Sequence, residues 1–222
     1  PAWPTLTGYT PGLLNQSPRA DVEAALGALK AGRAEQGKKL AGATLAQIEA
    51  DPGLLQFARE AGRSAFGDNC ATCHGSGAQG GKGYPNLNDD VWLWGGKLED
   101  IRHTLEVGIR STHPDARQSQ MPAFGRDGLL EKAQIDDLTD YVLHLSGAKA
   151  DAAAVTRATT LFAEQCASCH MPDGKGNREF GAPNLTDREW LYGGKREDIR
   201  AQIRSEEHTS ELQSHSDLVC RL

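Results

Sequence analysis

The chain lacks any long hydrophobic run. Its 222 residues are 38% hydrophobic and 24% charged, and no segment approaches the roughly 20 consecutive apolar residues that a membrane-spanning helix needs. No charged-then-apolar leader opens the sequence at Pro1. We therefore expect the chain as given to be soluble, with any membrane anchor or signal lying ahead of it.

Basic and aromatic residues are also in short supply. The 24 Lys and Arg against 30 Asp and Glu give a formal charge of -6. A nucleic-acid-binding chain needs a basic patch to neutralise phosphates, so this balance excludes that class and favours a basic protein partner. Only 6% of the residues are aromatic. This composition suits small domains better than one large core, unless a bound apolar cofactor adds to the core.

An internal repeat is the most informative feature that is present. FGDNCATCHG at 66–75 matches FAEQCASCHM at 162–171 with an offset of 96 residues. PNLNDDVWLWGGKLEDIR at 85–102 matches PNLTDREWLYGGKREDIR at 183–200 with an offset of 98. Such a duplication predicts two similar domains in tandem, with two residues inserted in the Gly-rich loop of the second copy.

The local sequence pattern predicts helices throughout. Helices are expected to begin at Ser17-Pro18, at Thr44 and at Asp51-Pro52, where a capping residue or a proline precedes a segment without breakers. A further helix is expected near 131–145, because apolar residues recur there with helical spacing. No segment keeps the two-residue alternation of a strand. The predicted fold class is therefore all-α, with a helical lead-in before two tandem domains.

Both copies carry two cysteines three residues apart, followed at once by a histidine. Positions i and i+3 of a helix share one face, so both sulfurs can bond to the two vinyl groups on one edge of a haem, and the histidine can bind its iron. We therefore predict two covalent c-type haems. The predicted thioether residues are Cys70, Cys73, Cys166 and Cys169, and the proximal iron ligands are His74 and His170.

Two other uses of the cysteines compete with haem attachment. The four could form one zinc site, which has the right ligand count. Each pair could instead be a redox-active CxxC at the start of a helix, with a lowered thiol pKa. Neither alternative explains why a histidine follows both pairs directly.

A haem iron also needs a ligand on its far face, and Met121 is the candidate. It follows His74 at a distance that lets a later loop wrap around the ring, and Pro122 stiffens its turn. His113 is a rival ligand. Met171, the only other methionine, directly follows His170, so its side chain starts on the wrong side of the ring.

Several residues are expected near the haems without binding iron. Pro85 and Pro183 open similar turns after each motif, where a carbonyl can accept the N–H of the proximal imidazole and fix its orientation. Four aromatic side chains are expected to pack near the haem edges, with ordinary core packing as the alternative: Trp92, Trp94, Trp190 and Tyr192.

Together the motifs resemble the periplasmic diheme cytochrome c part of subunit III of cbb-type cytochrome c oxidases, the high-oxygen-affinity terminal oxidases of bacteria. GKGYPNLNDDVWLWGG at 81–96 and HPDARQSQMPAFG at 113–125 carry this resemblance, which extends from Trp3 to about Ile203. It implies a lead-in over 1–50 behind a missing membrane anchor, a cytochrome c domain over 51–148, and a partial second one over 149–203.

The resemblance also implies a function. The family's subunit is not an enzyme on its own; it passes electrons from a soluble donor cytochrome c toward the haem–copper catalytic subunit, beside a monohaem cytochrome c subunit. The expected location is the periplasmic face of the bacterial cytoplasmic membrane. The alternatives are the cytochrome c subunit of a periplasmic dehydrogenase, or a diheme peroxidase with one five-coordinate haem.

The end of the chain departs from the repeat. The 98-residue offset places the counterpart of Met121 at position 219, where the sequence has Val219. RSEEHTSELQSH at 204–215 resembles one reading frame of a common sequencing-library adapter, so we expect 204–222 to be a non-native tail rather than a genuine polar helix. On this reading the second haem lacks its native distal methionine.

Overall fold

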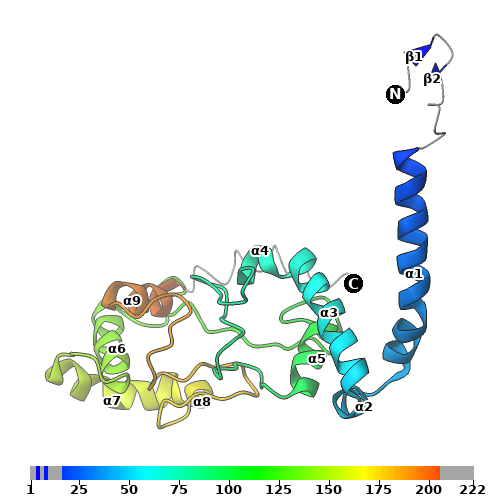
Figure 1. Ribbon diagram of the computed structural model, residues 1–222. Helices are drawn as coiled ribbons and strands as arrows, with labels where there is room; N and C mark the ends of the chain where they lie inside the picture. The colour runs from blue at the N-terminus through cyan, green and yellow to red at the C-terminus, as the bar shows by residue number, and fades with distance from the viewer. Residues whose placement is uncertain (1–3, 6–7, 10–16, 206–222) are drawn as a thin grey trace. The chain divides into compact units, whose positions relative to one another are not determined.

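The structure is a computed structural model that describes residues 4–5, 8–9 and 17–205 (Figure 1). The predicted tail, apart from its first two residues, and Val219 lie outside the described residues. Contacts divide the chain into two units, Pro1–Ser64 and Ala65–Leu222. The second unit holds both copies of the Cys-x-x-Cys-His motif.

The first unit contains the helical lead-in. Strands β1 (Pro4–Thr5) and β2 (Gly8–Tyr9) form an antiparallel pair. Helices α1 (Pro18–Gly42), α2 (Leu45–Ala50) and α3 (Pro52–Asn69) follow, and α3 continues into the second unit.

All three predicted helix starts are confirmed. The hydroxyl of Ser17 accepts the N–H of Ala20, Thr44 and Gln47 form a reciprocal capping box, and α3 begins at Pro52.

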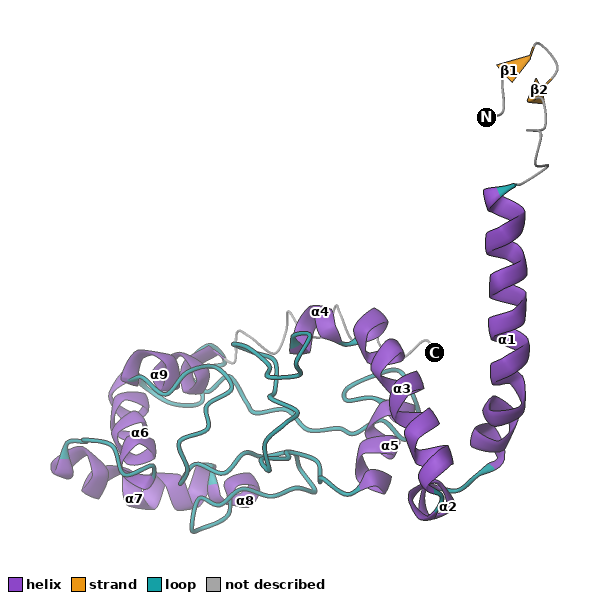
Figure 2. Ribbon diagram, in the orientation of Figure 1, coloured by secondary structure: helices purple, strands orange, loops and turns teal. Residues whose placement is uncertain are grey.

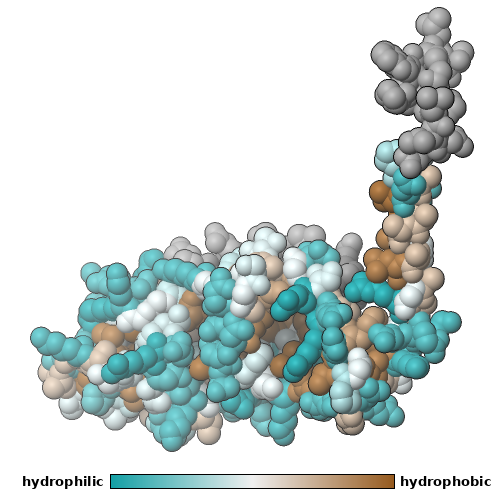
Figure 3. Space-filling model, viewed as in Figure 1, coloured by the Kyte–Doolittle hydropathy of each residue, from teal (hydrophilic) through white to brown (hydrophobic). Residues whose placement is uncertain are grey.

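Helix α1 contains no buried residue. Its apolar residues Val22, Leu26 and Leu29 are exposed, and their spacing places them on one side of the helix. Figure 3 shows hydrophobic surface along this helix. None of the helices that the structure describes is both long and apolar enough to cross a membrane.

The second unit is built from helices joined by long loops (Figure 2). In the first repeat these are α4 (Ala71–His74), α5 (Leu98–Val107) and α6 (Lys132–Leu145). In the second repeat they are α7 (Ala152–Gln165), α8 (Ala167–His170) and α9 (Arg196–Ser205). The predicted all-α class is confirmed.

The hydrophobic core forms where α6 packs against α7 and α9. Leu138 of α6 and Phe162 of α7 are each 1% exposed. Burying such side chains contributes about 1.5–3 kcal/mol each. The whole cluster comprises Phe124, Leu130, Ile135, Leu138, Val142, Leu143, Ala158, Phe162, Ile199 and Ile203.

Ion pairs reinforce this packing. Asp140 of α6 accepts a hydrogen bond of 2.5 Å from Arg196, and Asp136 pairs with Arg200. Asp137 accepts two hydrogen bonds from Arg157, and these bonds hold the pKa of its carboxyl below the usual value. All three arginines belong to the second repeat.

The first domain expected over 51–148 includes α6, yet in the structure α6 packs against α7 and α9 of the second repeat. The two repeats differ in the charged and apolar residues that they can present to α6. In the first repeat the counterparts of Arg157 and Arg196 are Ala61 and Leu98, so only one of the three cations is present there. Leu105 of α5 is 63% exposed, whereas its counterpart Ile203 is 6% exposed beneath α6. The domain boundary at 148 stays a prediction. Helix α6, which precedes this boundary, packs on the second repeat.

Replacing Leu138 tests this core. We expect Leu138→Ala to lower the free energy of unfolding by about 2–5 kcal/mol, because it removes a buried side chain and leaves a cavity. The matched control Leu105→Ala should change it by less than about 0.5 kcal/mol, since that side chain is exposed. Urea unfolding of both variants measures the difference; equal losses would contradict the core described.

Candidate functional site

The first Cys-x-x-Cys-His motif lies where α3 gives way to α4. Cys70 caps α4, and the N–H groups of Cys73 and His74 both donate to its carbonyl, at 3.2 and 3.0 Å. This turn keeps the two cysteines on one side and sends the chain past His74 into the Gly-rich loop. The Nδ1 atom of His74 lies 2.9 Å from the carbonyl oxygen of Pro85.

The second motif repeats this geometry closely. The N–H groups of Cys169 and His170 donate to the carbonyl of Cys166 at 3.2 and 2.9 Å. The Nδ1 atom of His170 lies 3.0 Å from the carbonyl oxygen of Pro183. With Nδ1–H donating to that carbonyl, Nε2 keeps the lone pair that a metal needs. The contacts have the geometry required of Pro85 and Pro183, while the iron-ligand roles of the histidines stay predictions.

The inserted residues of the second repeat lie between two matched anchors. The N–H of Gly80 donates to the carbonyl of His74, and that of Gly176 donates to the carbonyl of His170. These anchors keep the 96-residue offset, whereas Pro85 and Pro183 keep the 98-residue offset. The insertion therefore falls after Gly176, in a loop closed by the bridge of Asn177 with Ala182.

Burial sets the protonation of the second motif. His170 is buried, and this burial lowers the pKa of its imidazole, although the hydrogen bond to Pro183 opposes the shift. The imidazole is then neutral, the form that binds iron. Burial, with a smaller contribution from Cys169, raises the pKa of Cys166 to about 11.

These observations do not favour the alternative uses of the cysteines. A redox-active CxxC needs a lowered thiol pKa, and that of Cys166 is raised. Within residues 17–205, which include both motifs, no three Cys, His, Asp or Glu side chains gather where they could hold a metal ion. The zinc site and the redox pair therefore gain no support.

The two methionines lie in contrasting environments. Met121 packs against the core cluster that α6 forms with α7 and α9, and so do Cys166, Leu185 and Trp190. Met171 is 40% exposed. The rival ligand His113 accepts the N–H of Asp115 through Nδ1 within its own exposed loop. Met121 and Cys166 of the second motif thus border the same core cluster, although the sequence places Met121 after the first motif.

Aromatic side chains lie against glycines in both repeats. The rings of Trp92 and Trp190 lie so close to Gly96 and Gly194 that a Cβ atom there would overlap them. Both tryptophans belong to the predicted site residues. Their proximity to a haem edge stays a prediction.

Trp94 and Tyr192 instead join the two repeats. The Trp94 ring covers Gly181, and the Tyr192 ring covers Gly83, whose N–H donates to the carbonyl of Leu191 at 2.8 Å. The 98-residue offset relates Trp94 to Tyr192 and Gly83 to Gly181, so the contact is reciprocal, like a two-fold interface. Trp94 and Tyr192 were expected near the haem edges, whereas their contacts with Gly181 and Gly83 were not predicted, because only the matched positions of these glycines in the two repeats point to them.

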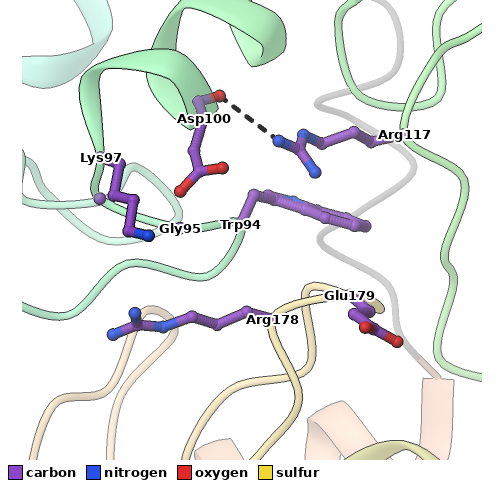
Figure 4. Close-up of a pocket in the computed structure, with 8 residues that line it drawn as sticks. Trp94, Gly95, Lys97, Asp100, Arg117, Arg178 and Glu179 are labelled. Atoms are coloured by element: carbon purple, nitrogen blue, oxygen red, sulfur yellow. Dashed lines mark hydrogen bonds between the residues drawn. The ribbon is translucent and has the colours of Figure 1, made fainter.

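A pocket of about 350 Å³ opens beside Trp94 between the repeats (Figure 4). The guanidinium of Arg117 lies 5.3 Å from the Trp94 ring centre and donates to Thr104 at 2.9 Å. A dashed line in Figure 4 marks its longer bond to the carbonyl of Asp100. The second repeat contributes Arg178 and Glu179. Sequence reasoning missed Arg117, because its partners come from distant parts of the chain.

Comparisons with known proteins agree with this geometry. The model of the cytochrome c family matches residues 59–146 and 155–214, which together make up more than half of the chain. The chain is therefore a cytochrome c with two tandem domain matches, which confirms the predicted domain type.

Its relatives identify the branch of that class. The chain is 54% identical, over 87% of its length and 67% of the relative's, to the cbb3-type cytochrome c oxidase subunit FixP of Bradyrhizobium sp. strain ORS 278. It is 51% identical, over 91% of its length and 70% of the relative's, to subunit CcoP of Cereibacter sphaeroides. It is 46% identical, over 94% of its length and 72% of the relative's, to the cbb3-type cytochrome c oxidase subunit FixP of Rhizobium meliloti.

The chain belongs to the FixP and CcoP family of cbb3-type oxidase subunits. This confirms the resemblance drawn from the motifs and the expected class, an electron-transfer subunit of an oxidoreductase complex. The dehydrogenase and peroxidase alternatives find no support among these relatives.

Replacing Gly181 tests the contact between the repeats. Gly181→Ala places a Cβ against the Trp94 ring, whereas Gly128→Ala adds one in open space at a similarly positive φ. Both should lose about 1–2 kcal/mol of unfolding free energy to backbone strain. Overlap with Trp94 should cost Gly181→Ala a further ~1–3 kcal/mol. Equal urea midpoints for the two variants would show that the contact does not stabilise the chain.

Proposed function

We propose that the chain binds two c-type haems, one at each motif, and relays electrons singly between them. The matched geometry of the motifs carries this proposal. In both, a helix delivers two cysteines to one turn, and a proline carbonyl lies within 3.0 Å of Nδ1 of the following histidine. A duplicated site that preserves these contacts suits two copies of one cofactor.

The cofactor supplies the redox chemistry, because haem iron changes between two oxidation states at a potential set by its ligands and surroundings. The chain supplies binding, orientation and exclusion of water. Cys70, Cys73, Cys166 and Cys169 would hold the haems through thioethers. His74 and His170 would bind iron through Nε2, with their rings fixed by the carbonyls of Pro85 and Pro183.

We assign Met121 to the second haem, as its distal ligand. Support comes from its packing against the core cluster that includes Phe162, because Cys166 and Trp190 of the second repeat pack against the same cluster. Helix α6 covers that core and follows Met121 by a short loop. The first haem is then the one without a methionine ligand in this sequence, the reverse of the assignment that the 98-residue offset suggests.

The partners follow from the family. The relatives are subunits of a cbb3-type oxidase, so we place this chain in such a complex, between a soluble donor cytochrome c and the haem–copper subunit, beside a monohaem cytochrome c subunit. An anchor ahead of Pro1 would hold it at the periplasmic face of the membrane. Without residues 205–222 of the expected tail, the net charge is -3 rather than -6, so charge adds little to the case for a basic donor and still argues against nucleic acid.

Counting haems tests the central proposal. We expect the chain, produced with a c-type maturation system, to carry two covalent haems, because each motif has both sulfurs and its histidine in place. Replacing Cys70 and Cys73 by serine, or Cys166 and Cys169 by serine, should leave one haem each. A denaturing haem assay per chain measures this. Zinc bound to a haem-free chain would overturn the proposal.

The two cysteine-to-serine variants, each with one haem, then show which haem iron Met121 binds. In the chain that keeps only the second haem, Met121→Ala should convert a low-spin spectrum to a high-spin one, because the iron loses its distal ligand. In the chain that keeps only the first haem, the same substitution should leave the visible spectrum unchanged. The opposite pattern would return Met121 to the first haem.

A further inference from the structure

Met171 has a strained backbone. It follows His170 directly, with φ 64° and ψ 156°, a region that only glycine enters readily, because the β-carbon of any other residue is crowded there. The first repeat has glycine at this position: Gly75 adopts φ 80° and ψ 152°. Strain of this kind persists only where the surroundings hold it, and it gathers at functional sites. A methionine where glycine fits best therefore points to a function of its side chain.

The side chain of Met171 is held at the surface. Its sulfur accepts a hydrogen bond of 3.9 Å from Nδ2 of Asn177, and the residue is 40% exposed. Asn177 in turn shapes the inserted loop, since its Oδ1 accepts the N–H of Glu179 at 2.9 Å and its carbonyl accepts that of Phe180 at 3.2 Å. Phe180 is 44% exposed. Asn177 thus links two exposed apolar side chains beside the second motif.

Among the described residues, the first repeat has no counterpart of this Met171–Phe180 patch. Its loop is two residues shorter, and Gly75 stands in place of the methionine. The aromatic residue of that loop, Tyr84, is half-buried, and its ring lies edge-on to His74 with 6.3 Å between the ring centres. The patch therefore belongs to the second repeat alone, and the fold that the two repeats share does not account for it.

The charge and size of the patch indicate what it binds. The segment around it, 171–182, carries two acidic and two basic residues, and Lys175 pairs with Asp173 at 3.4 Å. A face without net charge does not steer a charged partner. Methionine and aromatic residues are enriched at the centre of protein interfaces. Two side chains make too small a contact for a stable dimer, whereas the brief encounters of redox proteins bury little area.

We propose that the Met171–Phe180 patch is the surface on which a soluble donor cytochrome c docks to deliver electrons to the second haem. The inference rests on the proposed function, because it requires a haem at Cys166 and Cys169. Met171 directly follows the proposed iron ligand His170, so a protein docked here lies next to that haem. One electron passes at each encounter: the donor's ferrous iron is oxidised and the ferric iron of the second haem is reduced.

Stopped-flow mixing of the oxidised diheme chain with a reduced soluble monohaem cytochrome c tests this. We expect Met171→Gly and Phe180→Ala each to lower the second-order rate constant about tenfold, because each removes a central apolar contact. The controls are Ala78→Gly, at another left-handed position with φ 59°, and Leu105→Ala, at another exposed apolar one; both should leave the rate unchanged. Reduction by hexaammineruthenium(II), a small complex that needs no docking surface, should be equally fast in the unmodified chain and in every variant.

Two further measurements separate docking from damage to the haem site. Met171→Gly should not lower the urea midpoint, since relief of the backbone strain offsets the greater freedom of glycine in the unfolded chain. With both proteins reduced, so that no net electron transfer occurs, the donor should broaden the methyl NMR signal of Met171 and leave that of Met121 unchanged. An unaffected Met171 signal would contradict the contact.

Other results distinguish this inference from the function that it rests on. Two haems per chain, with both patch variants reduced as fast as the controls, would overturn the docking site and leave the electron relay standing. A rate that falls steeply with salt and ignores the patch variants would mean docking by charge elsewhere, and would also overturn it. A dimer in sedimentation that Met171→Gly abolishes would assign the patch to a second copy of the chain and overturn the donor assignment. A chain without haem would overturn both proposals.

Discussion

The packing of α6 onto α7 and α9 is the interaction on which the rest of the second unit depends. It buries Leu138 and Phe162, covers the helix that leads to Cys166, and fixes the loop that carries Met121. Apolar burial supplies most of the energy, because partly exposed ion pairs contribute little each. The three α6 aspartates instead select which repeat the helix covers.

The two motifs share local geometry but differ in environment. Each has its cysteine turn, its Gly-rich loop and a proline carbonyl beside the histidine, because these depend on residues within one repeat. The helices that lead into them differ in burial: α7 packs against α6 and buries Phe162, whereas α3 has no buried residue. His170 is 9% exposed, while every residue of α4 before the first loop is more open. Two sites with one chemistry in two environments can hold their electrons at different potentials.

Much of the local structure could be predicted from the sequence. Ser17, Thr44 and Pro52 mark the helix starts, and the spacing of Ile135, Leu138 and Val142 gives the buried face of α6. The packing partner of α6 could not be predicted from the repeat. The repeat pattern suggests that each helix packs within its own copy, whereas α6 packs against the second copy. Two signals point the other way: the short connection 146–151 favours pairing with α7, and the arginines facing Asp137 and Asp140 occur only in the second copy.

The central claim is that Met121 serves the second motif. NMR of the reduced diheme chain with methyl-labelled methionine tests it most directly, since the sequence has only two methionines and their signals are easily assigned. The account predicts a strongly ring-current-shifted Met121 methyl signal with contacts to the haem bound at Cys166 and Cys169. Contacts from that methyl to the haem at Cys70 and Cys73 would contradict it.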